Sequence, residues 1–176
     1  MFRPEQMGVY IHWPFCKDRC PYCDFNTYVR KHDFDEDAWL DAYLCVLDYY
    51  AEVLSDKEVV SIFFGGGTPS LISPEAAGRM ISRVRNSWRV AQDVEITLEA
   101  NPTSVENAKL QGFAQAGVNR LSLGVQSLME EGLAFLGRQH SVNDAIEALK
   151  FARENFSKYS FDLIYARPGQ SLQSWE

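Results

Sequence analysis

Three cysteines lie within eight residues, at Cys16, Cys20 and Cys23, in the spacing C-x-x-x-C-x-x-C. The stretch follows a short apolar run, and Pro14 and Pro21 stiffen it and disfavour a helix. Thiolates at this spacing can converge on one soft metal centre, usually an iron–sulfur cluster or zinc. A simple electron-transfer cluster has four cysteine ligands, and no fourth cysteine follows nearby. The stretch predicts a metal-binding loop, and three ligands on a four-iron cluster would leave one iron open to another molecule.

A structural zinc site is the alternative that the spacing leaves open. Cys16, Cys20 and Cys23 could join His12 in a closed Cys3His tetrahedron in which nothing reacts. The remaining cysteine, Cys45, falls on the polar side of an expected helix. We therefore expect Cys45 to face solvent and not to be a ligand.

Composition limits the class of protein. The chain has 176 residues, of which 46% are hydrophobic and 23% charged, as expected for one globular domain with a real core. Its net charge is −7 and it has no basic run, so nucleic acid and anionic lipid are not expected partners. We find no signal or transit peptide and no apolar run of about 20 residues that could span a bilayer. Clustered thiols then indicate a reducing, cytoplasmic setting.

Apolar runs alternate with helical patterns along the chain and predict the order βαβαβαβαβ. The expected strands are 9–13, 59–64, 94–98, 120–125 and 160–165. The expected helices begin with capping residues at 33–36, 73–74, 103–106 and 141–144, and one more should follow 168–169. The apolar face of the first helix is expected to comprise Trp39, Tyr43, Val46, Leu47, Tyr50 and Leu54.

This order predicts a parallel sheet with right-handed crossovers. In the third and fourth strands the polar side chains share one face: Glu95, Thr97 and Glu99, then Ser122, Gly124 and Gln126. Inward polar residues at carboxyl strand ends are typical of the mouth of a β/α barrel, whereas a dinucleotide-binding sheet would carry glycines after its first strand. A complete barrel takes about 250 residues. We therefore expect an α/β fold, a partial, open TIM-like barrel truncated after about the fifth strand.

The residues around the cysteines resemble the radical S-adenosylmethionine (SAM) superfamily. Tyr10-x-His12-x-Pro-Phe-Cys16 and Cys20-Pro-Tyr-Cys23-Asp-Phe25 are similar to the branch that holds oxygen-independent coproporphyrinogen III dehydrogenases and HemW-type haem chaperones. The resemblance runs from residue 10 to residue 175 and implies that 1–176 is an incomplete radical SAM core domain. The sixth strand and the C-terminal domain of those families would be absent.

The resemblance also implies a site. A 4Fe–4S cluster would be held by Cys16, Cys20 and Cys23, with SAM on the open iron. Residues 65–70, Gly-Gly-Gly-Thr-Pro-Ser, align with a segment that meets the methionine part of SAM, although a tight turn would also need glycine. His12 is expected to hydrogen bond near the cluster, and His140 to be only the residue before a helix cap. The implied cofactor-binding residues are Tyr10, Tyr22, Gly66, Gly67, Thr68, Glu99, Gln126, Arg138 and Asp162.

One position separates the two related families. The dehydrogenases carry a further cysteine two residues past the third ligand, where this chain has Phe25, as HemW-like proteins do. The resemblance therefore implies a HemW-like haem chaperone that binds a cluster and SAM and passes haem to an acceptor protein. The alternative is a radical SAM enzyme that decarboxylates coproporphyrinogen III, so the expectation leaves catalysis open. A structural zinc domain is the third interpretation.

One segment departs from the family pattern. The chain reads Tyr165-Ala166-Arg167-Pro-Gly-Gln170 where the family usually has Tyr-Gly-Leu-Pro-Gly-Gln. Alanine and arginine change the bulk and charge near the barrel mouth. The departure puts the local backbone geometry in question.

Overall fold

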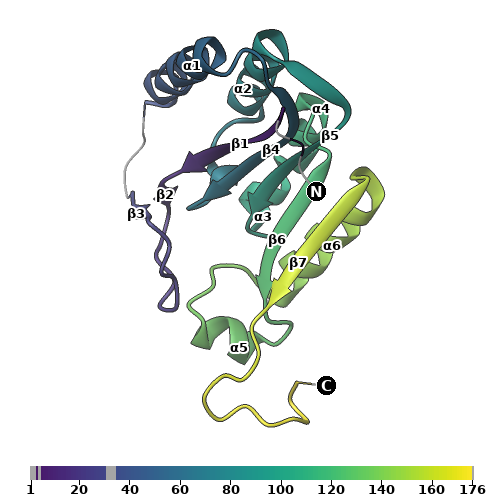
Figure 1. Cartoon of the computed structure of the whole chain (residues 1–176). Helices are drawn as coiled ribbons and strands as arrows, with labels where there is room; N and C mark the ends of the chain where they lie inside the picture. Colours follow the sequence, from purple (N-terminus) through teal and green to yellow (C-terminus); the bar gives the residue numbers. More distant parts are fainter. Residues whose placement is uncertain (1–2, 4, 31–34, 176) are drawn as a thin grey trace.

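Five parallel strands form an open sheet in the order β1-β4-β5-β6-β7 (Figure 1). The computed structural model describes residue 3, residues 5–30 and residues 35–175. The strands are β1 (Gln6–Trp13), β4 (Glu58–Gly66), β5 (Arg89–Ala100), β6 (Arg120–Gln126) and β7 (Lys158–Leu163). Each strand pairs with its successor in this series, so the predicted parallel βα order and the open partial barrel are confirmed.

Helices follow each of the first four long strands or the loop after it. They are α1 (Glu36–Val53), α2 (Pro74–Ser87), α3 (Ser104–Asn107), α4 (Leu110–Ala116), α5 (Glu130–Phe135) and α6 (Val142–Asn155). The side chains of Asp35, Ser73 and Ser141 cap α1, α2 and α6, as the sequence predicts. Residues 33–34 of the expected first cap lie outside the described residues. Figure 1 shows α1 beside α2, and α6 behind β6 and β7.

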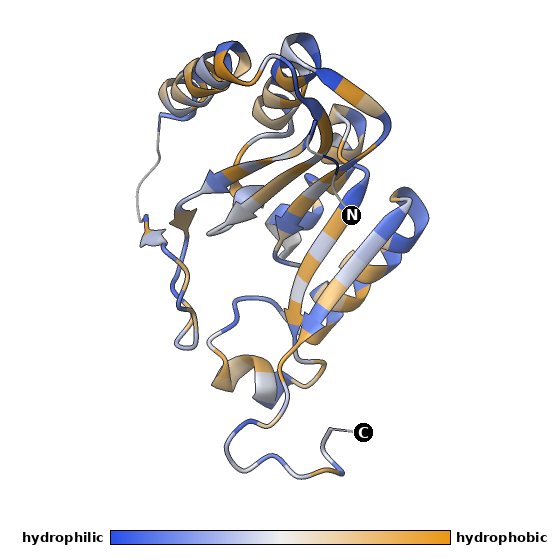
Figure 2. Ribbon diagram, viewed as in Figure 1, coloured by the Kyte–Doolittle hydropathy of each residue, from blue (hydrophilic) through white to orange (hydrophobic). Residues whose placement is uncertain are grey.

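Buried apolar residues alternate with more polar ones along β6, as its sequence predicts (Figure 2). Ile96 and Leu98 of β5 and Leu121 and Leu123 of β6 are fully buried in the core. Their alternating neighbours Glu99, Ser122, Gly124 and Gln126 line a cavity on the other face. The strands therefore bring their polar side chains together where β5 and β6 end.

Four details differ from the sequence-based expectation. The third strand starts earlier, at residue 89, and the helix expected from 103–106 is divided into α3 and α4. After Pro168 the described residues form turns instead of a helix, with one turn at 172–175 capped by Ser171. Helix α1 buries Leu40, Leu44 and Leu47, so the expected face is wrong at Val46 and Tyr50, which are both exposed. Cys45 is exposed, as expected.

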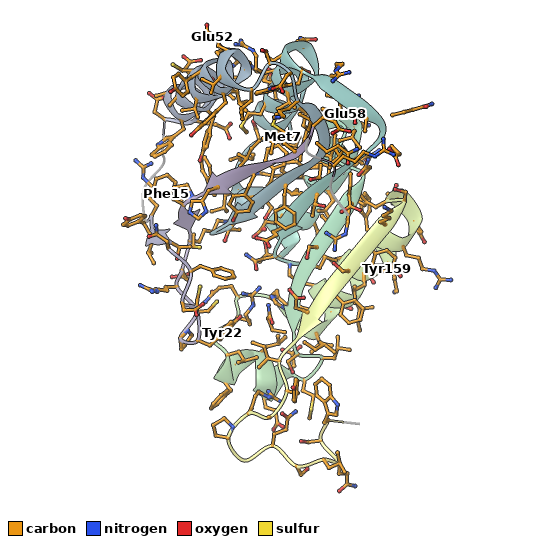
Figure 3. All side chains as sticks on the ribbon, in the orientation of Figure 1. Met7, Phe15, Tyr22, Glu52, Glu58 and Tyr159 are labelled. Atoms are coloured by element: carbon orange, nitrogen blue, oxygen red, sulfur yellow. The ribbon has the colours of Figure 1, made fainter. Side chains whose placement is uncertain are left out.

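The expected α1 face fails because the helix has two apolar stripes. Trp39 and Tyr43 do pack against the core, and Trp39 lies edge-on to Phe15 at 5.0 Å between ring centroids. The side chains of Val46 and Tyr50 are half exposed, at 52% and 50%. Figure 3 shows Glu52 on the outer side of the same helix, away from the sheet.

Candidate functional site

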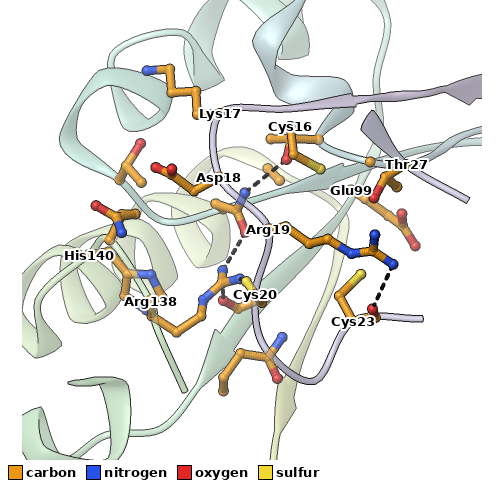
Figure 4. Close-up of a pocket in the computed structure, with 18 of the residues that line it drawn as sticks. Cys16, Lys17, Asp18, Arg19, Cys20, Cys23, Thr27, Glu99, Arg138 and His140 are labelled. Atoms are coloured by element: carbon orange, nitrogen blue, oxygen red, sulfur yellow. Dashed lines mark hydrogen bonds between the residues drawn. The ribbon is translucent and has the colours of Figure 1, made fainter. Parts of the chain in front are cut away.

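A cavity of about 450 Å³ opens where β5, β6 and β7 end, and the cysteine loop covers it (Figure 4). Three parts of the chain enclose it: the cysteine loop, the turn after β4, and the polar strand ends. Of the twelve predicted site residues, ten line this cavity. They are Cys16, Cys20, Tyr22, Cys23, Gly67, Thr68, Glu99, Gln126, Arg138 and Asp162.

The cysteine loop is anchored at its base by a short parallel pair of strands, β2 (Phe15–Cys16) and β3 (Tyr28–Val29). Tyr28 N–H donates to the Pro14 carbonyl at 2.8 Å, and Arg30 N–H donates to the Cys16 carbonyl at 3.0 Å. Within the loop, Cys23 N–H donates to the Cys20 carbonyl at 3.0 Å. Figure 3 shows Phe15 at the base of the loop and Tyr22 near its far end. The three cysteines therefore lie on one short loop whose base is fixed by backbone hydrogen bonds.

The glycines after β4 pack against this base. Gly67 N–H donates to the Trp13 carbonyl at 2.6 Å, and Thr68 N–H donates to the Phe15 carbonyl at 2.9 Å. A Cβ on Gly67 would lie 2.6 Å from the Phe15 oxygen, so only glycine fits. Gly66 has a φ of 110°, and a Cβ there would lie 2.6 Å from Nδ1 of His12. Close chain packing therefore suffices to explain both glycines.

Acidic side chains meet on the cavity floor. The Glu99 carboxylate accepts a hydrogen bond from Gly66 N–H at 3.2 Å. Burial raises the pKa of Glu99, and the nearby Asp162 carboxylate raises it further, while the Gly66 bond opposes them. Tyr10 lies outside the cavity lining but close enough that the Glu99 charge adds to the burial that raises the Tyr10 pKa. The floor therefore favours a cationic or hydrogen-bond-donating ligand group.

Arg138 crosses the cavity from the segment before α6 to the cysteine loop. Its Nη1 lies 3.3 Å from Sγ of Cys20 and 3.4 Å from the Tyr22 hydroxyl. Its Nη2 donates to Oδ1 of Asn101 and to the Gly124 carbonyl, the latter at 2.9 Å. Burial raises the pKa of Tyr22 to about 12, so the hydroxyl stays protonated at neutral pH. Arg138 thus connects the loop to β5 and β6.

The backbone at Gln126 is strained where it reaches the cavity. Its φ is 68°, in the left-handed region, and Ser127 N–H donates to the Val125 carbonyl at 2.8 Å across a tight turn. His140 is 5% exposed, and its Nε2 lies 3.1 Å from the same carbonyl. Burial lowers the pKa of His140, and the Arg138 charge lowers it further. His140 is therefore a buried, neutral donor that holds this turn, which corrects the expectation of a simple pre-cap residue.

Two residues of the site, Asn101 and Glu106, were not predicted from the sequence. Asn101 connects Arg138 to Thr68, whose hydroxyl oxygen lies 3.4 Å from the Asn101 amide nitrogen. Glu106 is 3% exposed and accepts hydrogen bonds from the Ser70 hydroxyl and from Asn101 N–H. Asn101 could have been found, because it follows Glu99 by two residues and so continues the same strand face. The sequence around Glu106 predicted only a helix cap and not a buried acceptor beside the cavity.

The donor set suits a sulfur-ligated cluster better than the Cys3His zinc alternative. The three thiols line one cavity, burial raises the pKa of Cys16, and hydrogen bonds from Thr68 and Thr27 oppose that effect. Nε2 of His12 instead lies 3.2 Å from the Asn26 carbonyl. The residues present fit a larger soft centre that three thiolates share.

The described part of the chain contains no helix that is both long and apolar enough to cross a bilayer.

Residues 10–176 match the family model described as the radical SAM superfamily. The chain is 41% identical to "Heme chaperone HemW" of Escherichia coli, over 98% of this chain and 46% of that protein. It is 40% identical to "Radical S-adenosyl methionine domain-containing protein 1, mitochondrial" of Bos taurus, over 97% of this chain and 39% of that protein. The chain therefore spans less than half the length of these relatives.

A solved structure described as coproporphyrinogen III oxidase (HemN) from Escherichia coli, a radical SAM enzyme, has the same fold. It superposes with a TM-score of 0.87 at 30% identity, covering 98% of this chain and 40% of that one. The resemblance found in the sequence is confirmed at the level of both family and fold.

Proposed function

The chain belongs to the radical SAM superfamily, and on that premise we propose that its cavity binds a 4Fe–4S cluster and SAM as part of a HemW-like haem chaperone. The observation that carries the proposal is the convergence of Cys16, Cys20 and Cys23 with the polar strand ends on one cavity. Three thiolates are one ligand short of a closed cluster, which leaves a position for SAM. The relatives named as haem chaperones support the haem-carrying part.

Each cavity wall has a role in this proposal. Cys16, Cys20 and Cys23 hold the cluster, and the loop base at β2 and β3 fixes their spacing. Glu99 offers a carboxylate to the ammonium or ribose hydroxyl groups of SAM, since its surroundings favour a positive or donating partner. Gln126, Asp162 and the backbone at Gly67 and Thr68 line the remaining polar wall.

A bound 4Fe–4S cluster would supply single electrons to SAM. The residues of this chain bind and orient SAM and limit the access of water. Tyr22 contributes to this enclosure, because it lines the cavity and its hydroxyl is held near Arg138. The raised pKa of Tyr22 keeps that hydroxyl from ionising, so it adds no negative charge beside the thiolates.

Phe25 favours the chaperone over the dehydrogenase. The side chain is 59% exposed and lines the cavity near the third cysteine, where a further cysteine would be expected in the dehydrogenase family. We therefore propose haem, not coproporphyrinogen III, as the tetrapyrrole that the whole protein handles, and a haem-dependent protein as its acceptor. The decarboxylating enzyme is the second candidate, supported by the fold shared with the structure named HemN.

A reducing compartment is part of the same proposal, because free thiols must persist until a cluster is loaded. The clustered thiols predict the cytoplasm, and the Bos taurus relative is named as mitochondrial. Either compartment meets this chemical requirement.

Anaerobic iron–sulfur reconstitution followed by EPR of the reduced protein, with and without SAM, tests the core of the proposal. We expect a four-iron signal that changes shape when SAM is added, and its loss in Cys16→Ala. A colourless protein with one tightly held zinc would overturn the proposal. Haem titration of the full-length protein, run beside an assay of coproporphyrinogen turnover, then separates the two functions. Turnover with 5′-deoxyadenosine formed in step would favour the enzyme.

A further inference from the structure

We propose that Arg138 sets the reduction potential of the cluster through Cys20, as a positioning residue that is distinct from the SAM-binding wall. The inference rests on the proposed function and deepens it. The sequence resemblance implies only that Arg138 contacts SAM. The geometry indicates a second task, because the guanidinium is directed at a cluster thiol.

The contacts of Arg138 use almost all of its donors. A guanidinium has five N–H groups, two on each Nη and one on Nε. Nη1 reaches Cys20 Sγ at 3.3 Å and the Tyr22 hydroxyl at 3.4 Å. Nη2 reaches Asn101 Oδ1 and the Gly124 carbonyl. Only Nε, which is buried, lacks a hydrogen-bond partner within the described protein, so little capacity is left for a ligand carboxylate.

The guanidinium is held at two points beside the sheet, by the Asn101 side chain and by the Gly124 backbone. Asn101 follows β5 directly, and Gly124 lies inside β6. A Cβ on Gly124 would lie 3.3 Å from Nη2 of Arg138, so a side chain there would crowd the guanidinium. These contacts hold a full positive charge beside Cys20.

Such a charge favours the reduced cluster. Adding one electron, supplied by an external reductant, makes the cluster and its thiolates more negative. A hydrogen bond and a cation at a ligand sulfur stabilise that added charge, and hydrogen bonds to the sulfurs are among the factors that set cluster potentials. Arg138 should therefore raise the midpoint potential and make the cluster easier to reduce.

Arg19 provides a matched control within the same loop. Its Nη2 lies 3.5 Å from the Cys23 carbonyl, so it donates toward backbone and not toward a sulfur (Figure 4). Arg19→Gln and Arg138→Gln each remove one positive charge near the cysteine loop. Only Arg138→Gln removes a charged hydrogen bond to a ligand sulfur.

The experiment is an EPR-monitored redox titration of the reconstituted protein without SAM. We expect Arg138→Gln to move the midpoint to a more negative potential, and Arg19→Gln to move it much less. Equal midpoints for wild type and Arg138→Gln, at equal iron content, would overturn the inference. So would equal shifts in the two variants. Failure of the wild type to form a four-iron cluster would instead overturn the proposed function.

A second variant covers the case in which Arg138→Gln does not load a cluster. Arg138→Lys keeps the charge but cannot fork between Cys20 and Asn101. We expect it to load, with a midpoint below that of wild type. A midpoint equal to wild type would overturn the role of the forked hydrogen bond, because lysine keeps the positive charge. SAM affinity, measured separately by equilibrium binding, reports the SAM-contact role without depending on the potential.

Discussion

Glu99 is an acidic residue that lies where its charge costs stability. Its pKa is raised, so the folded protein favours the neutral form. The stabilisation is therefore present at low pH and is lost as pH rises through the folded pKa. We expect Glu99→Gln to melt at a higher temperature than wild type at pH 8, with a smaller difference at pH 5, and to bind SAM more weakly. Thermal melts at the two pH values and equilibrium binding measure this.

The control for Glu99→Gln is Glu147→Gln, at an exposed glutamate of α6 that pairs with Lys150 at 2.9 Å. This change should leave both the pH dependence and SAM affinity near wild type. A Glu99→Gln protein that is less stable than wild type at pH 8, or that binds SAM equally well, would show that the carboxylate stabilises the fold instead of serving a ligand.

Ala166 adopts a backbone conformation that glycine would adopt more easily. Its φ is 58°, where a Cβ costs about 1 kcal/mol or more. The family pattern has glycine here, so the departure seen in the sequence corresponds to local strain. We expect Ala166→Gly to stabilise the protein by about 1 kcal/mol, less the extra flexibility that glycine adds to the unfolded chain. Chemical denaturation measures the free energy of unfolding.

Gly169 gives the opposite test in the same segment. It has a φ of 77° and open space around its Cβ position, so Gly169→Ala adds strain without a clash. The free energy of unfolding should fall by about 1 kcal/mol. If both substitutions shift stability in the same direction, the assigned conformation of this segment is wrong.

Individual site residues could be predicted from the sequence where the alternation of a strand determines which face of the sheet a side chain lies on. It grouped Glu99 with Gln126 because every second residue of a strand faces the same way. It missed His140, whose hydrogen bond to Val125 depends on how a loop returns to β6. Gly66 and Gly67 remain predicted ligand contacts, and both also pack closely against the chain around His12 and Phe15.

At the scale of the element, α1 shows that a helix with two apolar stripes cannot be oriented from its own sequence. Leu44 is 8% exposed and packs in the core, whereas Val46 is 52% exposed. Leu44→Ala should destabilise the protein by about 2–4 kcal/mol, and Val46→Ala by no more than about 0.5 kcal/mol. Urea denaturation of the two variants measures this difference. A larger loss of unfolding free energy for Val46→Ala than for Leu44→Ala would show that Val46 lies on the buried face, as expected from the sequence.

Glu106 joins two turns that border the cavity. Its carboxylate accepts hydrogen bonds from Ser70, in the 3-10 turn Pro69–Leu71, and from Asn101 and Thr103, between β5 and α3. Removing it leaves three donors without their acceptor, so Glu106→Ala should cost about 2–4 kcal/mol. Glu106→Gln retains one oxygen and should cost less than half as much. Denaturation midpoints of both variants test this, and equal losses would contradict the role of the hydrogen bonds.

For the whole molecule, the sequence was sufficient to predict the parallel sheet, but not the contacts between distant segments that enclose the cavity. Parallel strand order follows from local alternation of β and α segments and the handedness of their connections. The cavity depends on contacts between distant parts of the chain, such as the one between Cys20 and Arg138, which local periodicity does not encode. The helix expected after 168–169 was wrong for a related reason. Side-chain hydrogen bonds, such as the one that Gln170 accepts from Arg167 N–H, compete with a helix there.

The contact between Cys20 and Arg138 also has a consequence for the order of folding. These residues are 118 positions apart, with β4, β5 and β6 between them. So distant a contact forms only after the intervening strands have paired, because closing the loop costs entropy that local contacts do not recover. During synthesis the three thiols are made first, and the side chain that contacts Cys20 is made 118 residues later. In pulsed hydrogen-exchange refolding, amides of residues 16–23 should therefore gain protection after those of β4 and β5. Until then the thiols remain exposed to oxidation and to unwanted metal ions. This exposure follows from the order of Cys20 and Arg138 along the chain.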